Sequence, residues 1–324
     1  MTVVLVTESE FKRAESVFTS AAGLHCIPAP IDEAEFARAI TAAGGRHVVV
    51  GHYRYGSHLY QTLSRGGVIA RFGVGHEGVD KVKATQAGLL CTNTPGVLDQ
   101  SVAEHVIALL LAAARHVVRN ASDMRRGTWD LGPNGTELRG KTLAIIGAGR
   151  IGRATARIAS RGFGMRVVGF RRARGTDPDP DFSAITNDFE SAVRGAHFVT
   201  LHITADAENS KFIDAKRLAM LSPHGWLINA ARGAILDEDA LYDALVQGKL
   251  AGAAIDVFQR EPYVPAEPSR DFRTLPNVIL TPHVGSHTYE ANRLMGERAL
   301  ENIRLAEAGQ FSAMDLLNPE VLKA

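Results

Sequence analysis

The sequence predicts an α/β fold with two doubly wound domains, each built on a parallel sheet, and a cleft between the domains. Short apolar segments that are typical of buried strands alternate with helical segments, and this alternation occurs in two successive series. Only the second series contains a glycine-rich turn between a strand and a helix. Strands that alternate with helices indicate βαβ units and therefore parallel sheets.

Length and charge limit the classes of protein to which the chain can belong. It has 324 residues, which is typical of about two domains, and its net charge of +1 gives no electrostatic reason to expect nucleic acid or a membrane as a partner. Cys26 and Cys91 are too few for a disulfide framework and lack metal-ligand spacing. The N-terminus does not resemble a signal peptide, and no apolar run reaches the ~18 residues of a membrane span. We expect a cytoplasmic protein without a metal.

The first series of strands and helices runs to about Pro95. Residues 3–6, 46–50 and 67–72 are predicted as buried strands, and residues 32–43 as a helix between them. A long apolar helix is then predicted over residues 99–120, with Asp99 as its N-cap. Because this helix is too apolar for a surface, we expect it to pack between the domains or against a second subunit.

The second series begins at Lys141, after a loop rich in glycine and proline. A last helix is predicted over residues 289–308. The strands predicted in this series are residues 143–147, 166–170, 197–203, 225–231, 252–258 and 278–283.

The glycine-rich turn matches the pattern G-x-G-x-x-G of dinucleotide-binding domains. It follows an apolar strand and opens a helix, which is the context that the pattern requires. Gly147 permits the tight turn, Gly149 lets the backbone approach a pyrophosphate, and Gly152 lets the helix pack closely on the strand. The helix N-terminus then offers free N–H groups to the phosphates. We therefore predict a Rossmann-like domain that binds a nicotinamide dinucleotide.

The end of the next strand predicts which dinucleotide binds. NAD sites usually carry an acidic residue about 20 residues after the glycines, where it binds the ribose 2′-hydroxyl. Here the strand ends in Arg171 and Arg172, followed by Arg174. Arginine can bind a 2′-phosphate through paired charge-assisted hydrogen bonds. The sequence therefore favours NADP (NADPH), with NAD as the weaker alternative.

Three later segments place polar residues just after buried strands: NAARG with Arg232, DVFQREP with Glu261, and TPHVGS with His283. Together with RFGVGHEGVD, NTPG, SVAEH and GAGRIG, in this order, they resemble the D-isomer-specific 2-hydroxyacid dehydrogenases over nearly the whole chain. That family includes glyoxylate/hydroxypyruvate reductases, D-lactate dehydrogenases and 3-phosphoglycerate dehydrogenases. The resemblance implies an oxidoreductase that transfers a hydride between a nicotinamide cofactor and a 2-oxo or 2-hydroxy acid.

The resemblance also implies roles for the three polar residues. His283 would donate a proton to the substrate carbonyl oxygen, since histidine changes charge near neutral pH. Glu261 would orient the His283 ring and favour its charged form. Arg232 would bind the substrate carboxylate and carbonyl oxygen. These three residues are the predicted catalytic set.

Further sites follow from the resemblance alone. The substrate carboxylate is expected at the backbone of a loop that contains Val74, Gly75 and His76, and His76 departs from the usual aromatic residue there. Arg54 could bind a phosphate or carboxylate of a larger substrate. Asp256 could accept a hydrogen bond from the nicotinamide carboxamide. The other cofactor positions carried over are Val102, Arg150, Ile151, Ile203, Thr204 and Ala231.

The expected organisation is a substrate domain of residues 1–98 plus 288–324 and a cofactor domain of residues 99–287. The resemblance implies a homodimer through the helix and loop near residues 100–135, to which Trp129 would contribute. Glyoxylate and hydroxypyruvate are the default substrates. Three alternatives stay open: a phosphoglycerate-type dehydrogenase, a nucleotide-sensing corepressor of the same fold, and a formate or phosphite dehydrogenase. Formate enzymes of this group carry Gln in place of the Glu, whereas here Gln259 lies two residues before Glu261.

Overall fold

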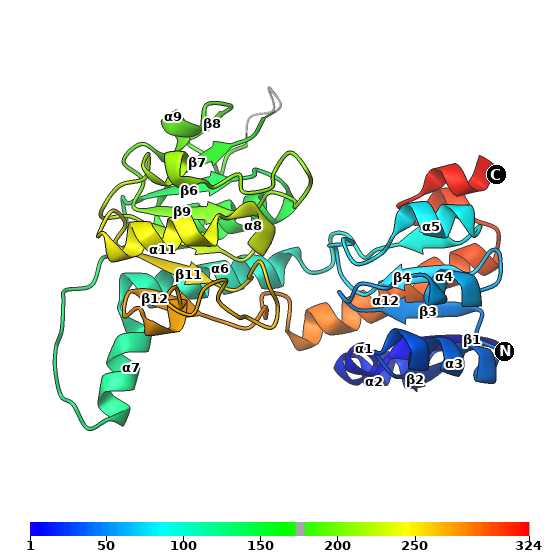
Figure 1. Ribbon diagram of the computed structural model, residues 1–324. Coiled ribbons are helices and arrows are strands. Elements are labelled where there is room, and N and C mark those ends of the chain that lie inside the picture. The colour runs from blue at the N-terminus through cyan, green and yellow to red at the C-terminus, as the bar shows by residue number, and fades with distance from the viewer. Residues whose placement is uncertain (173–178, 324) are drawn as a thin grey trace. The chain divides into compact units, whose positions relative to one another are not determined.

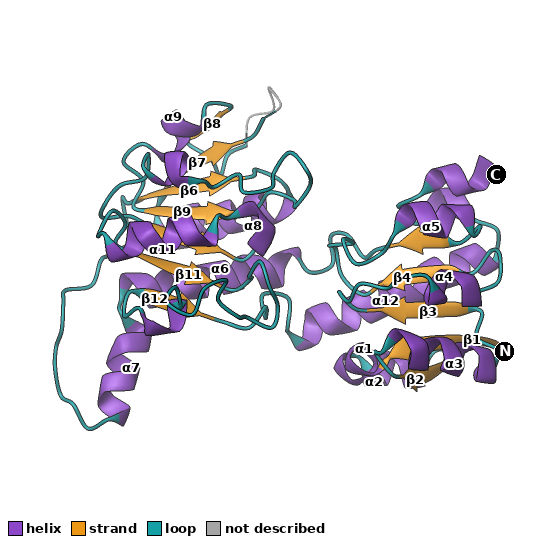
Figure 2. Cartoon of the chain, in the orientation of Figure 1, coloured by secondary structure: helices purple, strands orange, loops and turns teal. Residues whose placement is uncertain are grey.

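The computed structural model describes residues 1–172 and 179–323. The chain divides into two compact units, Met1–Leu98 with His287–Ala324, and Asp99–Ser286. Each unit contains one sheet, drawn as orange arrows in Figure 2, and every pair of named strands is parallel. The predicted fold class of two parallel α/β sheets is therefore confirmed.

The first unit has a five-stranded sheet in the order β2-β1-β3-β4-β5. The bounds of the strands are β1 Thr2–Thr7, β2 Leu24–Ala29, β3 His47–Val50, β4 Val68–Arg71 and β5 Leu90–Thr92. The helices are α1 Glu8–Arg13, α2 Glu15–Thr19, α3 Glu33–Ala43, α4 His58–Thr62, α5 Lys81–Gln86 and α12 Tyr289–Glu307, with 3₁₀ turns at Phe311–Ala313 and Pro319–Lys323.

The core of the first unit follows from the two-residue period of its strands. Leu5 of β1 and Ile69 of β4 belong to a buried cluster that also contains Phe36 and Ile40 of α3. Helix α3 presents these two side chains on one face because they lie four residues apart, and each stabilises the unit by roughly 1.5–3 kcal/mol through burial. The Asp32 carboxylate accepts N–H bonds from the first turn of α3 and so caps the helix.

The second unit has a seven-stranded sheet in the order β12-β11-β10-β9-β6-β7-β8 (Figure 1). The strands are β6 Thr142–Ile146, β7 Arg166–Phe170, β8 Ala184–Thr186, β9 Phe198–Leu201, β10 Trp226–Asn229, β11 Gly252–Ile255 and β12 Val278–Leu280. The helices are α6 Asp99–Ala114, α7 Val117–Arg125, α8 Arg150–Arg157, α9 Phe189–Val193, α10 Ala215–Leu218 and α11 Glu238–Val246. A π-helical turn lies at Ile158–Gly162, and 3₁₀ turns lie at Gly233–Ile235 and Phe272–Thr274.

Both faces of the seven-stranded sheet are buried. In β6, Ala144 and Ile146 point into a cluster with α9, α10 and α11, whereas Leu143 and Ile145 point into a cluster with α6 and α8. Successive side chains of a strand face opposite sides, so a strand covered on both sides must be apolar throughout. This explains why the segments of the second series read as continuous apolar runs.

The prediction of a single long helix over residues 99–120 is wrong. The chain forms two helices, α6 and α7, bent by 65° at a break, and His116 in the break has a left-handed φ of 52°. Helix α6 begins at Asp99 itself rather than after it. The apolar side chains of α6, including Val106 and Leu110, pack on the sheet of the second unit.

Among the described residues, no single helix is long and apolar enough to span a membrane, although α6 and α7 together pass that test as a bent pair.

Candidate active site

The glycine-rich turn lies at the carboxyl end of β6, beside β9, where the order of the strands reverses. Ligands of open α/β sheets bind at such a switch point. Gly147 has a φ of 112°, and a Cβ on it would lie 2.7 Å from the His202 carbonyl carbon, so a larger residue does not fit. A Cβ on Gly149 would meet none of the described residues within 4 Å. The turn therefore has a tight first glycine and an open second one, as a pyrophosphate requires.

A pocket of about 350 Å³ opens beside this turn. Ile203 and Thr204, which follow β9, contribute to it, and so do Arg171 and Arg172 after β7. The structure thus brings these four predicted cofactor residues together around one cavity. The remaining lining residues are Gly147, Ala148, Gly149, Phe170, Asp206, Asn209 and Phe212.

Arg171 has two buried nitrogen atoms, Nε and Nη2, that find no hydrogen-bond acceptor among the described residues. Leaving buried guanidinium donors unpaired costs free energy, and Arg171 lines the pocket, so its positive charge favours an anionic ligand there. A phosphate can accept two such bonds at once. The Arg171 side chain therefore fits the 2′-phosphate of NADPH. Arg174 lies outside the described residues.

Arg172 differs from the expectation that it is available to a 2′-phosphate. Its Nη1 donates to Glu208 Oε2 at 2.5 Å, and its Nη2 donates to the Asn209 side-chain oxygen and, at 3.3 Å, to the Glu208 carbonyl. These contacts engage three of the five guanidinium N–H donors of Arg172, so fewer donors are left for a phosphate. Neither Glu208 nor Asn209 was predicted, because both lie 36–37 residues further along the chain.

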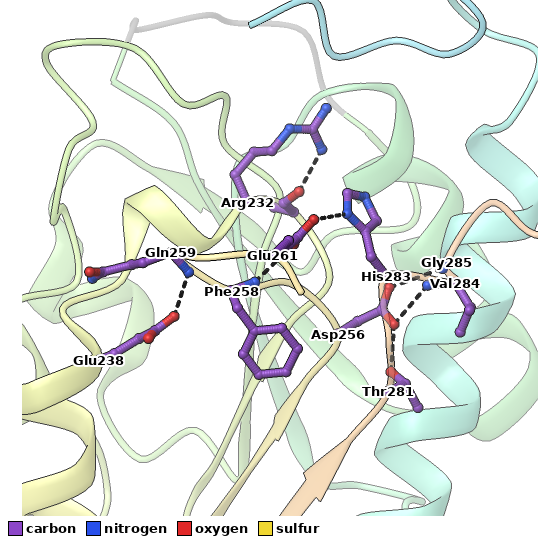
Figure 3. Close-up of polar contacts among 11 residues, drawn as sticks. Arg232, Glu238, Asp256, Phe258, Gln259, Glu261, Thr281, His283, Val284 and Gly285 are labelled. Carbon is purple, nitrogen blue, oxygen red and sulfur yellow. Dashed lines mark hydrogen bonds and ion pairs between the residues drawn. The ribbon is translucent and has the colours of Figure 1, made fainter. Parts of the chain in front are cut away.

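His283 and Glu261 form a pair on the loops that follow β12 and β11. His283 Nδ1 lies 2.7 Å from Glu261 Oε2, and Glu261 Oε1 accepts a 3.0 Å bond from the Phe258 N–H (Figure 3). The second bond fixes the carboxylate, so the carboxylate in turn fixes the ring. Glu261 engages Nδ1, and Nε2 is the other ring nitrogen that can exchange a proton. The His283 side chain is 35% exposed, which gives a ligand and solvent access to it.

Gln259 does not take the place of Glu261. Its side-chain nitrogen donates to the Leu236 carbonyl at 2.6 Å, and its backbone N–H donates to Glu238 Oε1 at 2.6 Å. Figure 3 shows its side chain directed away from His283. Glu261 is therefore the carboxylate partner of His283, and the geometry expected of a formate enzyme is absent here. The Glu238 carboxylate accepts the backbone N–H of Gln259 and so holds the loop that carries Glu261. Burial raises the pKa of the Glu238 carboxyl group.

Arg232 follows β10 and precedes a 3₁₀ turn. Its Nη1 donates to the carbonyl of Ala231 at 2.6 Å, and its guanidinium lies on the same side of the loops as His283 and Glu261 in Figure 3. A Cβ on Gly233 would lie 1.9 Å from the carbonyl carbon of Phe258, so glycine is required for the two loops to approach each other. The three predicted catalytic residues therefore extend from neighbouring loops at the carboxyl ends of β10, β11 and β12.

Asp256 differs from the open acceptor that was expected. It directly follows β11 and is 0% exposed, and its carboxylate accepts bonds from Thr281 Oγ1 at 2.5 Å and from the N–H groups of Val284 and Gly285 at 3.0 Å. Burial alone would raise the pKa of Asp256, but bonds from His105, Thr281 and the Val284 N–H outweigh it and lower the pKa to about 2. The carboxylate is charged and holds the loop that carries His283.

The other predicted residues occupy separate places. Arg150 and Ile151 begin α8, and Val102 of α6 lies near the site, because a Cβ on Gly285 would be 3.8 Å from its Cγ1. The predicted substrate residues belong to the first unit, where Arg54 follows β3, and Val74, Gly75 and His76 follow β4. The Val74 carbonyl accepts a 2.7 Å bond from the Asn93 side chain, which fixes that loop.

Comparisons with known proteins agree with this arrangement. Residues 107–285 match the family described as D-isomer specific 2-hydroxyacid dehydrogenase, NAD binding domain. The glyoxylate reductase of Pyrococcus furiosus is 37% identical over 278 residues, which cover 83% of this chain and 81% of that protein. The glyoxylate reductase of Thermococcus litoralis is 38% identical over 263 residues, covering 79% and 78%. The NADPH-dependent glyoxylate/hydroxypyruvate reductase of Sinorhizobium meliloti, solved with NADP and malonate, superposes with a TM-score of 0.76 at 29% identity, covering 94% of this chain and 93% of that one.

Proposed function

The chain belongs to the D-isomer specific 2-hydroxyacid dehydrogenases, and we propose that within this family it reduces glyoxylate and hydroxypyruvate with NADPH. It is a nicotinamide-dependent oxidoreductase that acts on 2-oxo and 2-hydroxy acids. The observation that carries the proposed chemistry is the 2.7 Å pair of His283 and Glu261, on loops next to the one that carries Arg232. This set supplies a proton donor, a residue that orients it, and a cation for the substrate carboxylate.

The proposed mechanism assigns one task to each catalytic residue. The bound cofactor supplies a hydride to the carbonyl carbon of the 2-oxo acid. His283 donates the Nε2 proton to the carbonyl oxygen, which becomes the hydroxyl group of the product. Glu261 accepts the Nδ1–H throughout, so it keeps the ring in one orientation and stabilises its charge before the transfer. Solvent then returns a proton to His283.

Arg232 is proposed to bind the substrate through its guanidinium. Two parallel N–H bonds can hold the carboxylate oxygen and the carbonyl oxygen of a 2-oxo acid at once. This contact fixes the carbonyl carbon for hydride transfer, and its positive charge stabilises the negative charge that develops on the carbonyl oxygen. The glyoxylate reductases of Pyrococcus and Thermococcus support small 2-oxo acids as the substrates.

The preference for NADPH is proposed from Arg171. Arg171 lines the pocket beside the glycine-rich turn and has two buried donors without an acceptor among the described residues, and the similar Sinorhizobium enzyme is NADPH-dependent. Gly147, Gly149 and Gly152 would hold the pyrophosphate with the first residues of α8, Arg150 and Ile151. Additional cofactor contacts are assigned to Val102, Ile203, Thr204 and Ala231, whereas Asp256 is buried and its carboxylate binds the loop of His283 instead of the carboxamide.

Replacing Arg171 tests the cofactor assignment. Arg171→Asp should raise the dissociation constant of NADPH by roughly 30-fold, because a repelling carboxylate replaces charge-assisted bonds to the 2′-phosphate. The constant for NADH should change by less than about threefold, since NADH lacks that phosphate. Both are measured by fluorescence titration of the reduced cofactors. Arg194→Asp, at an exposed arginine paired with Glu190, is the matched control. Equal losses for the two cofactors would remove Arg171 from the phosphate site.

Initial rates test the proposed function as a whole. The enzyme is assayed with NADPH and with NADH, each with glyoxylate and with hydroxypyruvate, by following the absorbance of the reduced cofactor. We expect a higher kcat/KM with NADPH for both substrates. Faster turnover with NADH would contradict the cofactor assignment and leave the reaction class intact. If both cofactors bind and neither 2-oxo acid is reduced, the substrate assignment is wrong.

The two units are proposed to have separate roles. The second unit would bind the cofactor, and the first would bind the substrate through the backbone of Val74, Gly75 and His76. Arg54 would contact the far end of a larger substrate. These assignments rest on the family to which the chain belongs.

We also propose that the chain forms a homodimer through α7 and the segment after it. This region exposes a series of apolar side chains that water solvates poorly, of which Trp129 is 84% and Leu131 is 87% exposed. Val117, Val118 and Met124 of α7 are exposed as well. Light scattering should give twice the mass of one chain, and Trp129→Asp should lower that mass toward one chain. A wild-type mass of one chain at micromolar concentration would contradict the dimer.

A further inference from the structure

The turn that carries His283 is held by Asp256, the residue directly after β11. His283 has a left-handed φ of 54°, which a side chain other than glycine adopts at a cost. Its backbone N–H donates to the Asp256 carbonyl at 2.7 Å, and the next two N–H groups, of Val284 and Gly285, donate to the Asp256 carboxylate at 3.0 Å. Such a conformation persists only where the surroundings impose it, and here Asp256 imposes it through three bonds.

A histidine from a distant helix completes this arrangement. His105 of α6 places its Nε2 at 3.3 Å from Asp256 Oδ1 and at 3.3 Å from Thr281 Oγ1. The Thr281 hydroxyl already donates its hydrogen to Asp256 Oδ1, so both neighbours of the His105 Nε2 can only accept. His105 therefore carries its proton on Nε2 and donates it into the network. The His105 side chain is 18% exposed and the Asp256 side chain 1%, so water replaces this donor poorly.

We propose that His105 is a positioning residue, which fixes the backbone of the His283 turn through Asp256 and Thr281. Removing its N–H leaves a buried carboxylate with one donor fewer, and the carboxylate then turns toward its remaining donors. Those donors are Thr281 and the N–H groups that define the turn, so the turn shifts and His283 with it. Glu261 orients the His283 ring, whereas His105 positions the backbone that carries the ring. The proposal rests on the proposed role of His283 as the proton donor.

Three variants separate this role from a general effect on stability. His105→Leu removes the donor at similar volume, His105→Gln restores an N–H donor on a flexible chain, and Thr281→Val removes the second donor to Asp256. His224→Leu, at an exposed histidine of the same unit, is the matched control. We expect His105→Leu to lower kcat by about 10- to 100-fold, as small misplacements of catalytic groups do. His105→Gln should recover most of the lost rate, and the dissociation constant of NADPH should stay within about threefold.

A second measurement does not depend on activity. In the enzyme without substrate or cofactor, hydrogen exchange of the Val284 and Gly285 amides should be at least about tenfold faster in His105→Leu and Thr281→Val than in wild type. The amides of β11 should exchange at unchanged rates. Faster exchange at these two amides with unchanged β11 supports the proposal. Unchanged exchange at Val284 and Gly285, or equal acceleration throughout the second unit, overturns it.

The proton-donor role of His283 and the positioning role of His105 are tested by different outcomes. If His283→Ala keeps a near-normal rate, the proton-donor role is wrong and no kinetic consequence of His105 is expected, while the exchange result still reports the contact. If His283→Ala is inactive and His105→Leu turns over normally, the positioning role is wrong and the proposed function stands. Should His105→Leu fail to fold, the comparison of Thr281→Val and His105→Gln with wild type decides in the same way.

Discussion

His283→Ala should lower kcat for the reduction of glyoxylate by about 10²- to 10⁴-fold, the range that a positioned general acid contributes. The reason is that the alanine enzyme must take the proton from water, which no residue orients. The dissociation constant of NADPH should not change, since the glycine-rich turn and Arg171 lie after β6 and β7 rather than on this loop. Steady-state rates and fluorescence titration measure the two quantities on the same preparation.

The pH dependence of the wild-type enzyme gives an independent test of the same role. Reduction needs a proton from His283, so kcat/KM for the 2-oxo acid should fall with rising pH. Oxidation of the 2-hydroxy acid needs the neutral ring and should show the opposite trend. His224→Ala, at an exposed histidine, should keep both profiles. A His283→Ala enzyme with a near-normal rate and an unchanged profile would remove His283 from the reaction.

Arg232→Ala should lower kcat/KM for the 2-oxo acid by at least about 100-fold. Two charge-assisted bonds of about 1.5–3 kcal/mol each are lost, and one tenfold change corresponds to about 1.4 kcal/mol. Arg232→Lys should recover only part of this loss, because an ammonium group cannot form two parallel bonds to a planar ligand. NADPH binding should be preserved, as fluorescence titration would show.

Arg194→Ala is the control for Arg232, since Arg194 is an exposed arginine of the same unit that directly follows α9 and pairs with Glu190 one turn earlier in the helix. It should keep at least half of the wild-type kcat/KM. A loss of NADPH binding in Arg232→Ala equal to the loss of kcat/KM would mean that Arg232 supports the cofactor site or the fold instead of the substrate. Full recovery by lysine would show that charge alone, without the paired geometry, is sufficient.

Much of the fold was predictable because its signals are local. A strand buried on both faces must be apolar throughout, so β6, β7, β9, β10, β11 and β12 were all predicted from their runs of apolar residues. The strands that were missed are short or lie at a sheet edge. β2 contains Pro28 at the edge of its sheet, where the missing N–H does no harm, and β5 and β8 have only three residues each.

The predicted helix over residues 99–120 shows that sequence periodicity does not reveal every helix break. The residues from 99 to 120 continue a helical pattern through His116, and nothing local in the sequence marks a break there. The chain nevertheless takes a left-handed turn at His116 and starts α7 in a new direction. Helix propensity differences are a few tenths of a kcal/mol per residue, so tertiary packing readily overrides them.

By itself, the sequence determined the fold class, the glycine-rich turn and the identity of the family, because each depends on residue types in a fixed local order. The resemblance had already implied the pair of His283 and Glu261, and the structure adds its 2.7 Å distance. Only the tertiary structure decided which other groups meet. It engaged Arg172 with Glu208, left two Arg171 donors without an acceptor among the described residues, and buried Asp256 against His105, which lies 151 positions earlier. The physical reason is that a hydrogen bond depends on distance and direction to within a few tenths of an ångström, and spacing along the chain does not encode these for residues on different loops.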